Sequence, residues 1–317
     1  MHIVTGSDDN YVAGVLVLIA SASFHTPGLR VTVLDNGISA DNRARIDALG
    51  HHLGIPIARI GIDSARFADL PVRRGHLTSS TYLRLLIPDL MPDEERVIYM
   101  DCDMVVLDDL TPLSRLDLGD AIVAAVPCPS PNMEELAQMG IARGDYVNAG
   151  LLVMNLPVWR RENIAARCID ALSDPDHPLM SEDQSALNLV ARGRILPLPA
   201  RYNVYSDPAA YTDPALVPSD LAVIHYVVRL KPWLGKVPLG AVWWFHAGRI
   251  ADIMPPPRKT TARQSWSRRM SFLNKRRKLW IGVATGKRKY RILLAAQRKI
   301  ARLEHALLEQ EAARPQA

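Results

Sequence analysis

Cysteine and long apolar runs are both scarce in this 317-residue sequence. Its three cysteines show no Cys-x-x-Cys spacing and cannot all pair, which argues against a disulfide framework and favours a reducing, cytoplasmic environment. The apolar run at residues 12–22 is too short to cross a bilayer, and residues 1–6 lack the basic stretch that opens a signal peptide. No glycine-rich phosphate loop of the Walker type is present, which argues against a nucleotidyltransferase that holds its triphosphate in such a loop. We therefore expect neither a transmembrane segment nor a secreted, disulfide-bonded domain.

Acidic residues are absent from one long segment, residues 258–302, which carries 16 Lys or Arg. Residues 1–257 are the opposite, with 21 Lys or Arg and 30 Asp or Glu, a net charge of −9. Three consecutive prolines, residues 255–257, stiffen the connection between the two parts. We predict one large domain over residues 1–254 and a basic C-terminal tail over residues 255–317.

The tail interleaves its cations with apolar side chains. Trp266, Met270 and Leu273 follow helical spacing, and basic helices with aromatic residues favour the surface of an anionic membrane, here through residues 258–302. Nucleic acid is a disfavoured alternative partner, and a solvated tail without a partner is another. Apolar positions within residues 293–307 follow heptad spacing, which predicts a short self-associating helix.

Two aspartates spaced one residue apart, Asp101 and Asp103, directly follow the apolar run at residues 96–100. Side chains alternate along a strand, so both carboxylates emerge on the same side where the strand ends. They repel each other unless a cation lies between them, and a hard divalent ion there bridges to substrate phosphates. The same spacing recurs at residues 174–176 in a turn-rich segment with no preceding strand, which we interpret as a loop. The alternative for the first pair is a solvated strand end.

Strand and helix signals alternate along the chain. Strands are predicted at residues 3–4, 31–34, 55–60, 97–100 and 121–126, and helices at residues 10–24, 39–53, 79–87 and 158–172. This alternation predicts a largely parallel α/β sheet. Ligands of such sheets bind beyond the carboxyl ends of the strands, where residues 5–11 and 101–103 both fall.

Six short blocks follow in order over residues 1 to about 250. They read Asp8-Asp9-Asn10-Tyr11; Ser80-Thr81-Tyr82-Leu83-Arg84; Tyr99-Met100-Asp101-Cys102-Asp103; Asn148-Ala149-Gly150 with Asn155-Leu156 and Trp159; Asp183-Gln184; and His225 with Lys231-Pro232-Trp233. Together they resemble family 8 of the glycosyltransferases, most closely the bacterial retaining α-galactosyltransferases that extend lipooligosaccharide. The resemblance implies a GT-A fold, a Rossmann-like nucleotide-sugar-binding domain with a mixed sheet flanked by helices.

The resemblance also implies a donor and a metal. It puts Asp8, Asn10 and Tyr11 around the uridine of a UDP-sugar, with the Tyr11 ring stacked on the base. Asp101, Asp103 and His225 would bind Mn²⁺, with Mg²⁺ as the alternative, and two carboxylates with an imidazole suit that ion. The plain alternatives are a core aromatic for Tyr11 and a core histidine for His225.

Further residues are implied around the sugar. Lys231 would balance the charge of the diphosphate, and the alternative is a surface lysine. Arg84, Asn148, Asp183 and Gln184 would hold the sugar hydroxyls, with Asp183 and Gln184 at the reacting centre and helix or turn capping as the alternative for Asn148 and Asp183. Gln184 would lie near the far face of the anomeric carbon, and front-side and covalent mechanisms both stay open.

His76 matches an acceptor-side histidine of the family. One departure is that the usual glycine after the His-Tyr pair is absent, since residues 227–230 read Val-Val-Arg-Leu.

The function implied is retaining transfer of a hexose, galactose ahead of glucose, to a saccharide or glycolipid acceptor such as lipopolysaccharide. The enzyme would be cytoplasmic and peripheral on the inner face of the cytoplasmic membrane. The main alternative is an inactive relative that binds nucleotide-sugar and serves assembly at the membrane.

Overall fold

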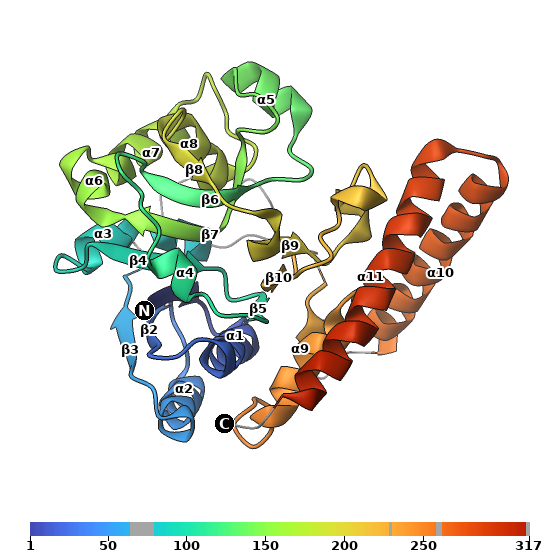
Figure 1. The fold of residues 1–317 in the computed structure, drawn as a ribbon, viewed down its shortest axis with the longest axis horizontal. Helices are drawn as coiled ribbons and strands as arrows, with labels where there is room; N and C mark the ends of the chain where they lie inside the picture. The colour runs from blue at the N-terminus through green and yellow to red at the C-terminus, as the bar shows by residue number, and fades with distance from the viewer. Residues whose placement is uncertain (64–78, 228–229, 258–261, 315–317) are drawn as a thin grey trace.

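The computed structural model describes residues 1–63, 79–227, 230–257 and 262–314 (Figure 1). A seven-stranded sheet forms its centre, in the order β3-β2-β1-β4-β7-β6-β8. The pairs β4·β7 and β6·β7 are antiparallel and the other pairs are parallel. The strands are β1 (His2–Ser7), β2 (Arg30–Asp35), β3 (Ile57–Gly61), β4 (Arg96–Met100), β6 (Val123–Pro127), β7 (Val147–Asn155) and β8 (Ile195–Pro197). The mixed sheet confirms the predicted fold class, and the expectation of a largely parallel sheet is confirmed as well, because among the seven strands described only β7 runs against the others.

Helices cover both parts of the sheet and continue into the tail. They are α1 (Val12–His25), α2 (Ala40–Leu53), α3 (Ile87–Leu90), α4 (Thr111–Ser114), α5 (Met133–Met139), α6 (Leu156–Arg161), α7 (Ile164–Ser173), α8 (Glu182–Val190), α9 (Gly240–Arg249), α10 (Ala262–Ala284) and α11 (Arg288–Ala313). The predicted helix at residues 158–172 is two helices, because the chain turns at Asn163, whose φ is 51°. The predicted helix at residues 79–87 is mostly the 3₁₀ helix η2 (Ser79–Leu86).

The apolar run at residues 12–22 forms the most buried helix of the fold. Of the 14 residues of α1, 12 are buried, because the helix contacts strand β5 (Met104–Val106) as well as α2 and α9. Gly14 allows α1 to lie close to the backbone of Cys102, since a Cβ at Gly14 would lie 2.5 Å from the Cys102 oxygen. This run is therefore core rather than a membrane segment, and it packs directly behind the chain that carries Asp101 and Asp103.

A second, three-stranded sheet brings distant residues to the end of β4. It contains β5 (Met104–Val106), β10 (Val223–His225) and β9 (Val204–Tyr205) in the order β5-β10-β9. The antiparallel register pairs His225 with Met104, and the backbone N–H of Tyr226 donates to the oxygen of Asp103 (2.9 Å). Strand pairing thus places His225 beside the aspartate pair.

The two C-terminal helices differ in their environment. Helix α11 buries Ala296, Ile300 and Leu307 within the chain, against α9 and the 3₁₀ helices η4 (Pro208–Ala210) and η5 (Pro214–Leu216). The prediction of self-association through residues 293–307 is therefore wrong, because this apolar face is already covered by the protein's own domain.

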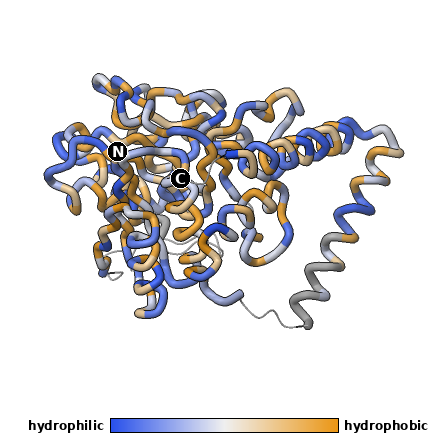
Figure 2. Tube along the Cα trace, turned by 60° about the horizontal axis from the view of Figure 1, so that its bottom comes forward, coloured by the Kyte–Doolittle hydropathy of each residue, from blue (hydrophilic) through white to orange (hydrophobic). Residues whose placement is uncertain are grey.

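Helix α10 stands away from the rest of the molecule, joined to the outer end of α11 (Figure 2). It exposes a series of large apolar side chains, Trp266, Met270, Leu273, Trp280 and Ile281. Among the helices that the structure describes, none combines the length and the apolar character needed to cross a membrane.

Candidate active site

Asp101 and Asp103 lie between β4 and β5, at the carboxyl edge of the sheet. The backbone N–H of Asp101 donates to the oxygen of Gly150 (2.8 Å), which fixes this turn against β7. The Nε2 atom of His225 lies 3.2 Å from Asp103 Oδ1 and 3.7 Å from Asp101 Oδ2. One ligand-type atom from each of the three side chains lies within 4.8 Å of the other two. The structure thus brings the three predicted metal ligands together.

The surroundings of Gly150 show that these residues fit an ion. A Cβ added to Gly150 would lie 2.4 Å from His225 Cε1 and 2.9 Å from Asp101 Oδ2, so only glycine leaves room for the side chains to converge. A set of two carboxylates and one imidazole suits Mn²⁺, whereas Mg²⁺ prefers oxygen ligands alone. The donor set therefore fits a divalent cation of the predicted kind.

Lys231 provides a fixed positive charge beside these ligands. Its Nζ donates to Asp103 Oδ2 (2.6 Å) and to the backbone oxygen of Tyr226 (2.8 Å). Burial favours the neutral form of Asp103, but Lys231 and His225 hold its pKa below the ordinary value. Burial also opposes the charge on Lys231, yet Asp103 raises its pKa. Both groups therefore stay charged, and the lysine is directed into the site.

Arg84, on η2, joins the aspartate pair to α8. Its Nη2 donates to Asp101 Oδ1 (3.1 Å), its Nε lies 2.9 Å from Asp183 Oδ2, and its Nη1 donates to the oxygen of Ala149. Its Cζ also lies 4.7 Å from the centre of the Tyr99 ring, whose hydroxyl donates to Asp101 Oδ1 (2.8 Å). Burial would lower the pKa of Arg84, but Asp101 and Asp183 raise it above its usual value. The predicted residues Arg84 and Asp183 thus form one charged network with Asp101.

The amides of Asn148 and Gln184 lie on the β7 side of this network. Asn148 Nδ2 donates to Gln184 Oε1 (2.7 Å), and the backbone N–H of Ala149 donates to the same oxygen (3.2 Å). The N–H of Gly150 donates to Asn148 Oδ1 (3.0 Å). Both predicted amides are therefore held by backbone donors of the strand that also contacts Asp101.

The three predicted nucleoside-binding residues follow β1, on the same edge of the sheet. Asp8 Oδ1 accepts a hydrogen bond from the N–H of Asn10 (2.8 Å), which forms an Asx turn before α1. The ring of Tyr11 meets the ring of Trp233 edge to face, with 5.7 Å between the centroids. Burial raises the pKa of the Tyr11 phenol, so it stays neutral. Tyr11 thus contacts Trp233 and Asp103 contacts Lys231, so the segment of residues 231–233 touches both groups.

Some predicted residues lie outside the described part of the chain, and some residues of the site were not predicted from the sequence. His76 lies outside the described residues, as do Val228 and Arg229 in the segment where the family glycine is absent. Sequence reasoning assigned no site role to Tyr99, although it stands two residues before Asp101 on the same face of its strand. It also missed Asn203, which forms hydrogen bonds with Asn148 and His225. Asn203 belongs to none of the motifs found in the sequence.

A second group of ligand-type side chains, His25, His246 and Glu311, is buried where α1, α9 and α11 meet. The Nε2 atoms of His25 and His246 lie 3.1 and 3.5 Å from Glu311 Oε2. Arg314 donates to His25 Nδ1 and approaches Glu311 Oε1 at 3.4 Å. Because a guanidinium only donates, the proton of His25 is on Nε2 and points at Glu311, and Arg314 already balances the carboxylate. This cluster attaches α11 to the domain and does not present a metal site.

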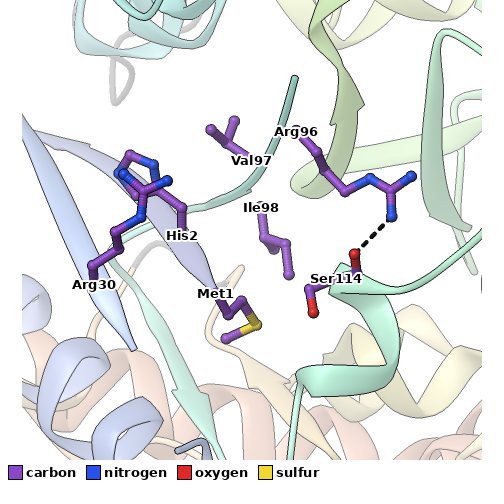
Figure 3. A pocket seen from close by; sticks show the side chains of 7 residues that line it. All are labelled: Met1, His2, Arg30, Arg96, Val97, Ile98 and Ser114. Atoms are coloured by element: carbon purple, nitrogen blue, oxygen red, sulfur yellow. Dashed lines mark hydrogen bonds between the residues drawn. The ribbon is translucent and has the colours of Figure 1, made fainter. Parts of the chain in front are cut away.

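A cavity of about 180 Å³ lies at the opposite end of the strands from the aspartate pair (Figure 3). Its lining includes Arg30 and Arg96, from the first residues of β2 and β4. Arg30 is paired with Glu94 at 2.6 Å, and Arg96 Nη1 donates to the oxygen of Ser114 (2.7 Å). Both cations are already engaged, and none of the candidate site residues that the structure describes lines this cavity.

Comparison with solved structures identifies the class of protein. The galactosyltransferase LgtC in complex with donor and acceptor sugar analogs superimposes with a TM-score of 0.68 at 30% identity, covering 83% of this chain and 98% of that one. Another structure of LgtC is of an active-site variant in which a glutamine is replaced by glutamate, with a TM-score of 0.69 at 30% identity, covering 78% of this chain and 96% of that one. The fold is that of a glycosyltransferase of the GT-A type.

Sequence comparison names the family. Residues 2–236 match the model of glycosyl transferase family 8, and the chain belongs to this family. General stress protein A of Bacillus subtilis is 32% identical, over 74% of this chain and 87% of the relative. The lipopolysaccharide 1,3-galactosyltransferase of Salmonella typhimurium is 28% identical, over 73% of this chain and 72% of the relative.

Proposed function

We propose that the protein transfers a hexose from a UDP-sugar to a saccharide acceptor with retention of anomeric configuration. The observation that carries this proposal is the convergence of Asp101, Asp103 and His225 next to the charged Lys231 at the carboxyl edge of the sheet. Galactose is favoured over glucose because LgtC and the Salmonella typhimurium relative are galactosyltransferases. The name of that relative also makes lipopolysaccharide, or another cell-surface glycan, the favoured acceptor.

The donor-binding roles follow the positions of the side chains. Asp8, Asn10 and Tyr11 would contact the uridine, and Arg84, Asn148 and Asp183 the sugar hydroxyls. Asp101, Asp103 and His225 would hold Mn²⁺, with Mg²⁺ as the alternative. Bound there, the ion supplies Lewis-acid stabilisation to the diphosphate. His76 is proposed for the acceptor side.

The reaction breaks the bond between the anomeric carbon and the diphosphate, and its electron pair passes to UDP. Lys231 stabilises this developing negative charge from a fixed position. The acceptor hydroxyl oxygen bonds to the anomeric carbon, and its proton passes to the departing diphosphate. Gln184 is a neutral amide, and Asp183 is held by Arg84 at 2.9 Å, so neither is a free carboxylate nucleophile. This arrangement favours front-side substitution over a covalent intermediate.

The decisive experiment measures UDP release from a panel of UDP-sugars with Mn²⁺ and with EDTA. Asp103→Asn removes one charge at nearly constant shape and should lower release by about 10²- to 10³-fold. Asp176→Asn is the matched control, because Asp176 is likewise the second aspartate of an Asp-x-Asp pair but is exposed in a turn-rich segment, where the change should have no effect on UDP release. Equal activity of the two variants would contradict the assignment of the site.

The alternative of an inactive relative predicts a different result. The unchanged protein would then bind a UDP-sugar without releasing UDP in the presence of any saccharide acceptor. Failure to bind any UDP-sugar would refute the nucleotide-sugar site itself.

For the tail we propose peripheral binding to the inner face of the cytoplasmic membrane, with residues 1–254 as the catalytic domain and residues 255–317 as the membrane-association tail. The support is the exposed apolar face of α10, including Trp266 (67% exposed) and Trp280 (56% exposed), in a segment of 16 cations and no acidic residue. Such a surface suits an anionic bilayer.

The tail proposal is tested without deleting α11, because that helix completes the core. Replacing Trp266, Trp280 and Ile281 with serine should abolish sedimentation with phosphatidylglycerol vesicles and leave donor turnover with a soluble acceptor unchanged. Trp244→Ser, on α9 and 51% exposed, is the matched control. Undiminished sedimentation of the triple variant, or preferential binding to nucleic acid, would overturn the proposal.

A further inference from the structure

We propose that Asn203 is a positioning residue that sets the ring tautomer of His225 and couples it to the amides of Asn148 and Gln184. The proposal rests on the metal site proposed above and adds a residue that none of the sequence motifs contains. Asn203 directly follows the 3₁₀ helix η3 (Ala200–Tyr202) and is only 3% exposed. Its amide lies between the candidate metal ligand and the candidate sugar-binding residues.

The first contact determines where the proton of His225 lies. The Nδ1 atom of His225 is 2.9 Å from Asn203 Oδ1, and an amide oxygen can only accept a hydrogen bond. Nδ1 of His225 therefore carries a proton and donates it to Asn203. Its Nε2 atom, 3.2 Å from Asp103 Oδ1, is then the ring nitrogen left to bind an ion. This is the tautomer that binds a metal through Nε2, and the partner on the other nitrogen is what maintains it.

Two backbone donors fix the orientation of the amides independently. The N–H of Gly150 lies 3.0 Å from one end of the Asn148 side chain, so that end is its oxygen. Asn203 reaches the same oxygen at 2.8 Å and must therefore present its NH₂ group there and its oxygen to His225. The N–H of Ala149 likewise identifies the oxygen of Gln184, at 3.2 Å.

The chain of hydrogen bonds continues to a buried carboxylate. Glu135, on α5 and 2% exposed, accepts from Ser185 Oγ (2.7 Å), so the hydroxyl of Tyr146 must donate to Ser185 (2.8 Å). Gln184 Nε2 in turn donates to Tyr146 (3.1 Å). All six hydrogen bonds from His225 to Glu135 therefore run in one direction. The Glu135 carboxylate can only accept a hydrogen bond, and the metal-binding tautomer of His225 donates one from Nδ1. Both ends therefore require the same donor-to-acceptor direction along the chain.

Two substitutions separate the two contacts of Asn203. Asn203→Asp keeps an acceptor for His225 Nδ1 but places a second oxygen against Asn148 Oδ1. Asn203→Leu removes both contacts at similar volume. Asn155→Leu is the control for loss of a half-buried amide, because the Asn155 side chain donates to backbone oxygens of Gly119 and Ala121, at the other end of β7.

The first readout is ¹⁵N NMR of the histidine side chains in metal-free protein, with the His225 signals assigned from a His225→Gln variant. The unchanged protein and Asn203→Asp should show His225 protonated on Nδ1, and Asn203→Leu should lose this state. An unprotonated Nδ1 of His225 in the unchanged protein, or an identical spectrum in Asn203→Leu, would overturn the proposal. This readout requires neither bound metal nor activity, so it stands even where the proposed metal site fails.

The second readout is Mn²⁺ affinity by electron paramagnetic resonance, together with kcat and KM. Asn203→Leu should bind Mn²⁺ about 10- to 100-fold more weakly. Asn203→Asp should bind Mn²⁺ at least as tightly as the unchanged protein and lose about tenfold in kcat, because Asn148 and Gln184 are no longer held in their donor arrangement. Loss of Mn²⁺ binding in Asn203→Asp would refute the acceptor role, and an unchanged kcat would refute the coupling. Absence of Mn²⁺ binding in the unchanged protein would instead refute the metal site.

Discussion

Replacing Arg84 with methionine is predicted to lower the free energy of unfolding by about 3–5 kcal/mol. The side chain of Arg84 is 7% exposed, and its guanidinium contacts Asp183, itself 4% exposed, and Asp101, 26% exposed. Methionine fills most of the same volume, so the cost does not come mainly from a cavity. It comes from two carboxylates that lose the cation they share, one of them in a buried position where solvent cannot replace it.

Equilibrium unfolding in urea measures this cost, since urea leaves the ionic strength unchanged. The control is Arg30→Met, which removes an arginine that is 49% exposed and paired with Glu94, and should cost less than about 1 kcal/mol. The double variant Arg84→Met, Asp183→Asn should recover about half of the loss, because the buried charge is removed with its partner. If Arg84→Met costs no more than Arg30→Met, or if the double variant recovers nothing, the charged network does not stabilise the fold as described.

Two further predictions concern the metal site and the attachment of α11. Gly150→Ala should weaken Mn²⁺ binding by at least about tenfold, because the new Cβ would meet His225 Cε1. The control is Gly61→Ala, which should leave the affinity unchanged because no heavy atom lies within 4 Å of the added Cβ. Equal Mn²⁺ affinities of the two variants would contradict the steric argument. Burial lowers the pKa of His246 from 6.5 to about 4, with Glu311 opposing the shift and His25, Arg249 and Arg314 adding to it. The folded state keeps His246 neutral while the unfolded state takes up a proton, so stability present above pH 6.5 is lost as the pH falls towards 4, by up to about 3 kcal/mol. Denaturation across this range should show the loss, and His246→Phe should flatten it; an unaltered pH dependence in that variant would assign the proton uptake to another group.

The sequence was sufficient to predict much of the fold and the grouping of the site residues. The strands predicted at residues 3–4 and 97–100, followed by polar residues, indicated that two distant segments meet at one edge of the sheet; they do, at the ends of the paired strands β1 and β4. The location of His225 depended on resemblance, because a histidine after a short apolar run has no spacing that points to a metal. Pairing of β10 with β5 supplies that contact, and pairing between strands over 100 residues apart leaves no local signal.

The remaining differences have separate physical causes. Apolar positions such as Ala296, Ile300 and Leu307 correctly predicted a helix with one buried face, but periodicity does not say what covers that face. The helix break at Asn163 depends on the positive φ of that one residue. Asparagine can adopt a positive φ but usually does not, so its presence in the sequence does not predict a break. Asn203 escaped prediction because a single asparagine acquires its role only from the groups that the fold places around it.

The attachment of α11 has a consequence for how far the enzyme can reach. A helix of 26 residues is about 39 Å long. It is fastened to the domain from Ala296 to Glu311, so only its first turns project, and they carry α10. If α10 lies on a bilayer, this rigid attachment holds the candidate site at a constant height above the lipid. Acceptor sugars at that height would be extended, and those much nearer to the lipid or much farther out would be passed over.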